Sequence, residues 1–103
     1  MKKAKFLILC RGHYDVYLKE INGYIDGEFG YHKDERGKWI STDLESGMST
    51  TFKPTRKECK KWTDASTDFI KREKEKDYYK RNRARFQELK SLIEKEYGDE
   101  YNI

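Results

Sequence analysis

A highly charged helical pattern over residues 56–97 constrains the fold of this chain more than any other feature. At about 100° per residue, Trp62, Ala65 and Phe69 form one stripe that could lie on a sheet. A second stripe lies roughly 120° away on the same helix and comprises Tyr79, Phe86, Leu89, Ile93 and Tyr97. Residues 71–77 contain no apolar residue. The pattern predicts either a bend or break near residues 65–77, or one helix whose second stripe contacts another partner.

The start of this helical segment carries its own signal. Pro54 ends the preceding strand pattern, and Thr55 and Glu58 have the spacing of a capping box. In that motif the Thr hydroxyl and the Glu carboxylate satisfy backbone N–H groups that the first helical turn leaves unpaired. We therefore expect a helix to begin directly after Thr55.

Residues 1–54 read as strands joined by turns. Ala4–Cys10 is a short apolar run, typical of a buried strand. Asn22-Gly23 favours a two-residue type I′ turn, which predicts a hairpin of His13–Ile21 with Tyr24–His32. In that register Val16 faces Phe29 and Tyr14 faces Tyr31, with Leu18 on the same side, and this side is the expected core face. Polar turns at residues 33–37 and 45–47 then separate two further strands, Lys38–Asp43 and Met48–Lys53.

Together these signals predict an α+β fold. A four- or five-stranded antiparallel meander over residues 1–54 is followed by a C-terminal helical segment, one long bent helix or two helices, over residues 55–97, and by a tail over residues 98–103. A chain of 103 residues fits one domain. Its 41% charged residues alone would favour disorder, but 15% aromatic residues indicate a packed core.

Several patterns bear on the compartment. Cys10 and Cys59 lie far apart without a secretory pattern, which predicts reduced thiols. The apolar run of residues 6–9 is too short for a signal peptide, and no segment approaches the roughly 20 apolar residues of a membrane span. We expect a cytoplasmic protein of a bacterial host that does not contact the membrane.

The first candidate binding surface is the basic distal helix. The formal net charge is +4, and residues 55–97 hold fourteen Lys or Arg against nine Asp or Glu. Cations recur along one side and are interleaved with aromatic residues, and the set comprises Arg72, Lys76, Tyr79, Lys80, Arg81, Arg83, Arg85 and Phe86. Such a row could bind phosphates and stack on bases. The alternative is a solvated face that is neutralised by neighbouring acidic residues.

The second candidate is the outward face of the predicted hairpin, with His13, Tyr17, Tyr24 and His32. In the predicted register His13 lies opposite His32. Exposed aromatic residues on a sheet can form a platform for a protein partner or for stacked bases. Alternatively the first strand, the distal helix or a second subunit covers this face.

Metal and catalytic chemistry receive little support. Four possible zinc ligands exist, namely Cys10, His13, His32 and Cys59, but only the first two are closely spaced. The sequence contains no recognisable nucleophile motif and no Gly-rich phosphate loop. We expect a protein that is not an enzyme and uses no cofactor.

One resemblance adds to this reading. The segment of residues 37–47, with Trp39 on a strand and Ser46-Gly47 in a turn, and the capped helix that begins after Thr55 resemble small accessory proteins of Gram-positive phages or mobile elements. The likeness covers about the middle third of the chain. It implies an inhibitor that contacts a host defence factor, such as an anti-CRISPR protein. This chain is basic, which disfavours simple DNA mimicry and favours an acidic protein surface or nucleic acid itself as the target.

Three functions therefore stand as expectations. The first is a non-catalytic inhibitor that acts by protein contact. The second is a nucleic-acid-binding protein that uses the basic distal helix. The third is a structural homo-oligomer, such as a dimer formed through Tyr79, Phe86, Leu89 and Ile93.

Overall fold

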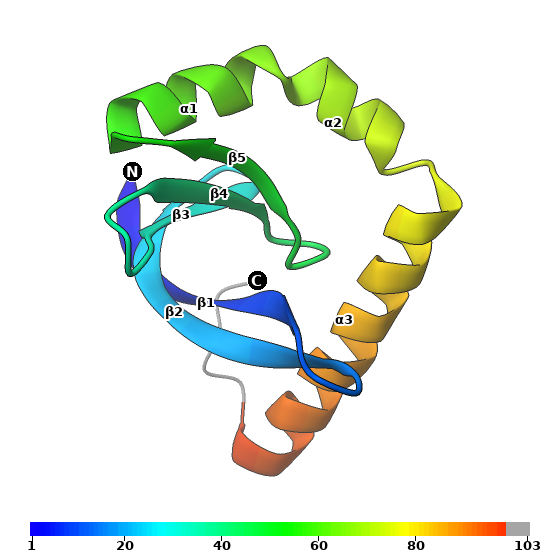
Figure 1. Ribbon diagram of the computed structural model, residues 1–103. Coiled ribbons are helices and arrows are strands. Elements are labelled where there is room, and N and C mark those ends of the chain that lie inside the picture. The colour runs from blue at the N-terminus through cyan, green and yellow to red at the C-terminus, as the bar shows by residue number, and fades with distance from the viewer. Residues whose placement is uncertain (99–103) are drawn as a thin grey trace.

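The computed structural model describes residues 1–98 and contains five strands followed by three helices (Figure 1). The strands form one antiparallel meander in the order β1-β2-β3-β4-β5, which confirms the predicted α+β class. The strands are β1 (Lys2–Arg11), β2 (Val16–Asp26), β3 (Phe29–Lys33), β4 (Trp39–Asp43) and β5 (Ser49–Lys53). The helices are α1 (Arg56–Ala65), α2 (Thr67–Glu73) and α3 (Asp77–Tyr97). Apart from Gly98, the expected tail lies outside the described residues.

The predicted hairpin turn at Asn22-Gly23 is wrong, because both residues lie inside β2. Strand β1 pairs with β2 over its whole length, from Lys2 opposite Ile25 to Arg11 opposite Val16. The turn into β3 falls instead at residues 27–28, where Gly27 has a φ of 61° that the turn requires. Consequently Tyr24, not Tyr14, lies opposite Tyr31, and the predicted pair of Val16 with Phe29 does not form.

Gly23 has a packing role in place of the predicted turn role. A Cβ atom added there would lie 2.3 Å from the carbonyl oxygen of Tyr31 and 3.0 Å from the ring of Phe6. The ring of Phe6 also lies over Gly30, where an added Cβ would be 2.7 Å from it. Phe6 is completely buried. One aromatic ring therefore fills the space that two glycines leave open.

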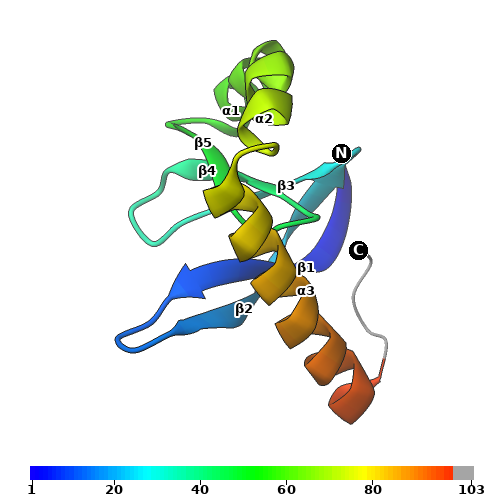
Figure 2. The same cartoon turned by 90° about the vertical axis from the view of Figure 1, so that its right-hand side faces the viewer.

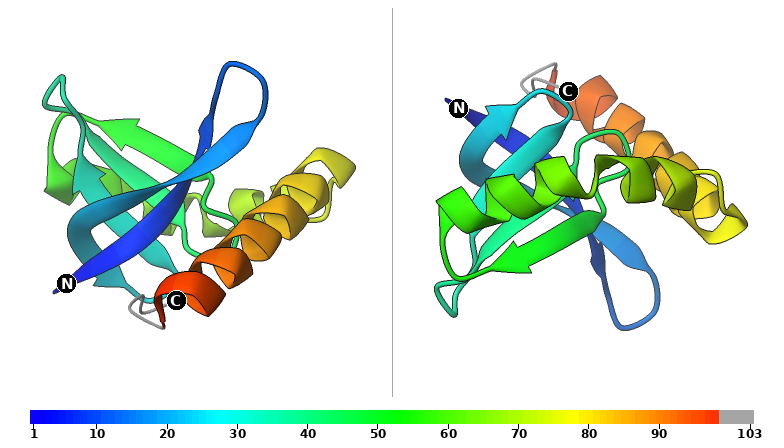
Figure 3. Two further views of the ribbon diagram at one scale, coloured as in Figure 1. Left: turned by 90° about the horizontal axis from the view of Figure 1, so that it is seen from below. Right: turned by 90° about the horizontal axis from the view of Figure 1, so that it is seen from above.

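The sheet folds over on itself, so that β1 and β2 cross beneath β3, β4 and β5 (Figure 3). Because side chains alternate between the two sides of a strand, the pairing register divides the sheet into two faces. We call the face that carries Phe6 the inner face and the opposite one the outer face. The register places these residues on the inner face with Phe6: Ile8, Cys10, Tyr17, Ile21, His32, Ile40 and Phe52.

Helix α1 packs on the outer face of β3, β4 and β5. The core beneath it contains Phe29, Tyr31, Cys59 and Ile70. The capping box is confirmed, since the backbone N–H of Glu58 donates to the Thr55 hydroxyl at 3.1 Å. The predicted break is also confirmed, because α1 ends at Ala65 and α3 begins at Asp77.

The stripe expected to lie on the sheet points away from it. Trp62 is 47% exposed and Phe69 is 57% exposed, and Ala65 is exposed as well. The side of α1 that meets the sheet carries Cys59 and Thr63 instead. The physical reason is that the sheet offers polar groups here: the Thr63 hydroxyl donates to the Ser41 hydroxyl at 2.8 Å, and both residues are fully buried.

Helix α3 crosses β1 and β2, as Figure 2 shows, and packs on the turn between β4 and β5. Phe86 is fully buried, and its ring lies against Gly47 so closely that an added Cβ would be 2.4 Å from it. The backbone N–H of Leu9 donates to the carbonyl oxygen of Gly47 at 2.8 Å. The turn is therefore held between β1 and α3.

A buried polar cluster connects this turn with the helices. Asp43 is 1% exposed, and its Oδ2 accepts hydrogen bonds from the hydroxyls of Ser46 at 2.7 Å and of Tyr79 at 3.2 Å. Its Oδ1 accepts from the Lys74 ammonium at 3.1 Å. Lys74 also forms an ion pair with Glu45 at 3.0 Å. Because these bonds satisfy the buried carboxylate, the cluster serves the fold.

None of the helices within residues 1–98 is both long enough and apolar enough to span a membrane.

Candidate functional site

The basic row on the distal helix is largely neutralised. Lys76 lies 2.6 Å from Glu73, and Lys80 lies 3.7 Å from Glu75. Acidic residues from the sheet region pair with two more cations: Arg83 with Glu45 at 3.2 Å and Arg85 with Asp15 at 2.9 Å. Among the cations of the predicted row, only Arg72 and Arg81 lack an ion pair within residues 1–98. The row therefore resembles the solvated alternative more than a phosphate-binding surface.

Two aromatic residues predicted for that surface are in the interior. Tyr79 is 4% exposed and Phe86 is fully buried, so neither side chain can contact a partner of the folded chain. The prediction that they form part of a binding or dimer surface is wrong, because their stripe packs on the chain's own sheet. Leu89 and Ile93 are half-buried, and the homodimer stays a prediction.

The structure places only two of the four residues of the second predicted face together. Tyr17 and His32 do share the inner face. Tyr24 lies on the outer face beneath Arg56, whose guanidinium is 4.5 Å from the centre of the Tyr24 ring. His13 lies outside the strands, in the turn after β1, where it contacts Tyr14. The predicted pairing of His13 with His32 is wrong, because it depended on the turn at Asn22-Gly23.

The inner face contains a cavity of about 350 Å³, which we call the inner-face site. Its apolar walls come from β1 and β2, and a basic and acidic rim comes from β2 and from the β3–β4 turn. The lining residues are Ile8, Cys10, Tyr17, Lys19, Ile21, His32, Lys33, Asp34, Glu35 and Arg36. This volume lies within the range of small-ligand pockets and could admit one flat ring.

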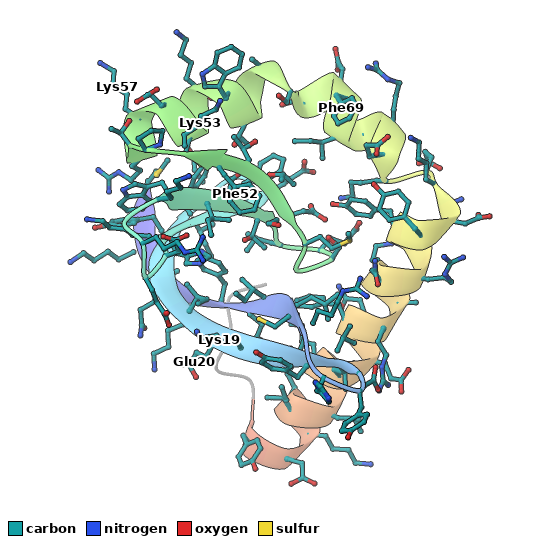
Figure 4. The ribbon with its side chains drawn as sticks, viewed as in Figure 1. Lys19, Glu20, Phe52, Lys53, Lys57 and Phe69 are labelled. Atoms are coloured by element: carbon teal, nitrogen blue, oxygen red, sulfur yellow. The ribbon has the colours of Figure 1, made fainter. Side chains whose placement is uncertain are left out.

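Two large aromatic side chains are exposed on this face. Tyr17 is 51% exposed and Phe52 is 55% exposed, although both lie within strands. Figure 4 shows Phe52 on β5 and Lys19 on β2, which belong to the two layers of the folded sheet. Helices α1 and α3 cover the outer face, so both aromatic side chains remain available to a ligand.

His32 is the buried polar residue of the inner-face site. It is 8% exposed, and its ring lies edge-on to that of Phe6 at a centroid distance of 6.2 Å. Its Nδ1 is buried without a hydrogen-bond partner among the described residues. Burial lowers the pKa of His32, and nearby Lys19 lowers it further against the opposing effect of Asp34, so the ring is neutral near pH 7. A ligand in the cavity could supply the hydrogen-bond partner that the Nδ1 atom lacks.

The rim carries both cations and carboxylates, and the cations outnumber the carboxylates of Asp34 and Glu35. Lys19, Lys33 and Arg36 form no ion pair within the part of the chain that the structure describes. Asp34 is occupied by its own turn, because its Oδ1 accepts from the backbone N–H groups of Arg36 and Lys38, both at 2.9 Å. With three cations against two carboxylates, the mouth of the cavity has a small positive excess, which favours negatively charged groups.

The structure does not assemble the candidate zinc ligands. Between residues 1 and 98 no three His, Cys, Asp or Glu side chains are grouped so that they could hold a metal ion. Cys59 is fully buried under α1, where its thiol points to the carbonyl oxygen of Thr51 at 3.7 Å. Cys10 lies on the inner face, and both thiols are free.

Comparisons of the chain with protein families, curated proteins and solved structures find no match. The resemblance to small phage accessory proteins therefore stays a prediction.

Proposed function

We propose that the protein is a non-catalytic binder of single-stranded nucleic acid and that the inner-face site holds the strand. The observation that carries this proposal is the combination of two aromatic residues exposed on the inner face, Tyr17 and Phe52, with a cavity rim whose three cations, Lys19, Lys33 and Arg36, outnumber its two carboxylates. Every nucleobase can stack on an aromatic ring, and Lys or Arg side chains attract the phosphates between bases.

The shape of the site favours a single strand over a duplex. A cavity of about 350 Å³ can admit one base but not a base pair within a helix. In a duplex the flat faces of the bases are already stacked and cannot reach the rings of Tyr17 or Phe52. The neutral His32 ring beside the cavity supplies a polar group where the edge of an inserted base would lie.

The test is fluorescence anisotropy with a labelled 12-nucleotide single strand of mixed sequence and its duplex, across a salt series. We expect tighter binding of the single strand, weakening as salt rises. Loss of one stacked base costs about 1–3 kcal/mol, so Tyr17→Ser and Phe52→Ser should each weaken binding roughly 5- to 150-fold. Tyr14→Ser is the matched control, because Tyr14 is 96% exposed and lies outside the strands.

Equal weakening in all three variants would contradict the proposal, and so would the absence of binding at low salt. Equal affinity for the duplex would show that charge alone attracts nucleic acid.

A second candidate is favoured by the outer side of α1 and α2. Trp62 and Phe69 are both about half exposed there, and the ammonium of Lys53 lies 4.8 Å above the Trp62 ring. Trp residues are enriched among the side chains that contribute most to binding in protein–protein interfaces. We propose, as the alternative, an inhibitor of a host defence factor that acts by protein contact, as the resemblance implies.

This alternative predicts a different set of sensitive residues. In a bacterial host that carries a CRISPR system, expression of the protein should protect a targeted plasmid. Trp62→Ser with Phe69→Ser should abolish that protection, whereas Tyr17→Ser should preserve it. If no protection occurs with the unmodified chain, this inhibitor class is excluded for that system.

A further inference from the structure

A second cavity lies at the start of α1, on the other side of the sheet from the inner-face site. It measures about 620 Å³ and is lined by Met1, Tyr24, Arg56, Lys57, Lys60 and Lys61. We call it the α1 pocket. Four of its six lining residues are cationic and come from the first two turns of one helix. Figure 4 labels Lys57 at this end of the molecule.

The four cations occupy one side of α1. Arg56 and Lys60 are four residues apart, as are Lys57 and Lys61, so they form two adjacent rows along the helix. Side chains in such rows can converge on a single ligand. Arg56 and Lys60 contact side chains of β2, namely Tyr24 and Asp26, while Cys59 and Thr63 occupy the buried side of the helix.

Aromatic contacts hold Arg56 in place. Its guanidinium lies 4.5 Å from the centre of the Tyr24 ring and 5.7 Å from that of Trp39. Such contacts engage the flat face of the guanidinium and leave its N–H groups free at the edge. Arg56 has no ion pair within residues 1–98. It is therefore a pre-positioned donor for an oxyanion.

Lys60 has a different role, since it neutralises the acidic residues beside the pocket. Its ammonium lies 2.8 Å from Asp26 and 2.9 Å from Asp64. The carboxylate of Glu58 is engaged by the Thr55 hydroxyl in the helix cap at 3.1 Å. Three cations then remain uncompensated in the described structure, namely Arg56, Lys57 and Lys61.

We propose that the α1 pocket binds an anion with two or more linked phosphate groups. Three uncompensated cations match the charge of such a ligand better than that of a carboxylate or a single phosphate. The planar guanidinium of Arg56 can donate two parallel hydrogen bonds to one phosphate, while Lys57 and Lys61 act as point charges on the next. Free polyphosphates, nucleotides and the phosphorylated end of a nucleic acid all present this chemistry.

The experiment is calorimetric titration of the full chain with inorganic tripolyphosphate at low salt. We expect saturable binding of one ion per chain. Lys57→Glu with Lys61→Glu should weaken it at least about tenfold. The matched control is Arg72→Glu with Arg81→Glu, which makes the same charge change at exposed, unpaired positions on α2 and α3. The control should stay within about threefold of the unmodified protein.

Absence of saturable binding would overturn the proposal. Equal weakening in both double variants would also overturn it, because net charge alone would then explain the attraction. The proposal is independent of the inner-face site: Tyr17→Ser and Phe52→Ser should leave tripolyphosphate binding unchanged, whether or not they affect single strands.

Two further ligands distinguish the sources of the phosphates. Tighter binding of adenosine triphosphate than of tripolyphosphate would assign a nucleotide to the pocket. Tighter binding of a 5′-phosphorylated 12-nucleotide strand than of its unphosphorylated form, with the difference abolished by Lys57→Glu and Lys61→Glu, would assign the end of a nucleic acid. Binding of tripolyphosphate alone would assign a free polyphosphate.

Discussion

Replacement of Gly47 by alanine tests how α3 is held to the sheet. Gly47 has a φ of 69°, a conformation that costs a residue with a Cβ roughly 1–2 kcal/mol. The added Cβ would also lie 2.4 Å from Cε1 of Phe86 and 2.8 Å from the backbone nitrogen of Leu9. Forcing an extra methyl group into a packed site costs about 1–3 kcal/mol. Gly47→Ala should therefore lower the free energy of unfolding by about 2–5 kcal/mol, a large part of the roughly 5–15 kcal/mol typical of a domain.

Gly27→Ala is the matched control for this prediction. Gly27 has a similar φ of 61°, but no atom lies within 4 Å of a Cβ added there. This variant should show the backbone cost alone, about 1–2 kcal/mol. Urea unfolding followed by tryptophan fluorescence measures both values. Equal destabilisation by the two substitutions would refute the contact of Gly47 with Phe86 as the source of the additional cost.

Two further predictions concern the buried polar cluster and its ion pairs. Tyr79→Phe removes the hydroxyl that bonds to Asp43 and Ser46, so the free energy of unfolding measured in urea should fall by about 1–2 kcal/mol. The control is Tyr78→Phe, which loses one exposed hydrogen bond to Glu73 and should change the free energy of unfolding by less than about 0.5 kcal/mol. Equal effects of the two would exclude a stabilising role for the Tyr79 hydroxyl. The hydrogen bond from Lys74, assisted by Arg83, lowers the pKa of Glu45 below its usual 4.5. The resulting stability is present above pH 4.5 and is lost as the pH falls through the lower folded-state pKa. Glu45→Gln should therefore flatten the pH dependence of the free energy of unfolding between about pH 5 and 3. The effect should be no more than about 0.5 kcal/mol, because Glu45 is exposed. An unchanged slope would contradict the stabilising role of the Glu45 carboxylate.

Structural features that depend on residues close together in the sequence could be predicted. The capping box of Thr55 and Glu58 and the break after Ala65 both follow from local spacing, and the structure contains both. The turn at Asn22-Gly23 failed because ten residues of β1 pair with β2 through that dipeptide. Such long-range pairing outweighs a local turn preference.

The predicted orientation of the first helical stripe was wrong for a related reason. The stripe of Trp62, Ala65 and Phe69 was expected to pack on an apolar sheet. The sheet instead presents the Ser41 hydroxyl, which accepts a hydrogen bond from Thr63 on the other side of α1. A pattern within one helix contains no information about the surface opposite it. Trp62 and Phe69 were therefore assigned to the wrong side.

The candidate site was predicted only in part. Tyr17 and His32 were identified from their residue types, although the pairing used to place them was wrong. The neutralisation of Arg83 by Glu45 and of Arg85 by Asp15 joins residues far apart in the sequence, so the spacing within the helix could not reveal it. Phe52 was not predicted, because its exposure depends on which face of the sheet the helices cover. Alternation along β5 could still have shown that Phe52 and Lys53 point to opposite sides of the strand.

The contact of Phe6 with two glycines has a consequence for how this chain can change over evolution. The ring of Phe6 occupies the space above Gly30, so residues 6 and 30 form a single size constraint. A side chain at Gly30 is tolerable only if the residue at position 6 becomes smaller, whereas a side chain at Gly23 would also meet the carbonyl oxygen of Tyr31 at 2.3 Å, which a smaller residue 6 does not relieve. Relatives of this chain should therefore show correlated substitutions at positions 6 and 30, and should keep glycine at position 23 whatever the size of residue 6.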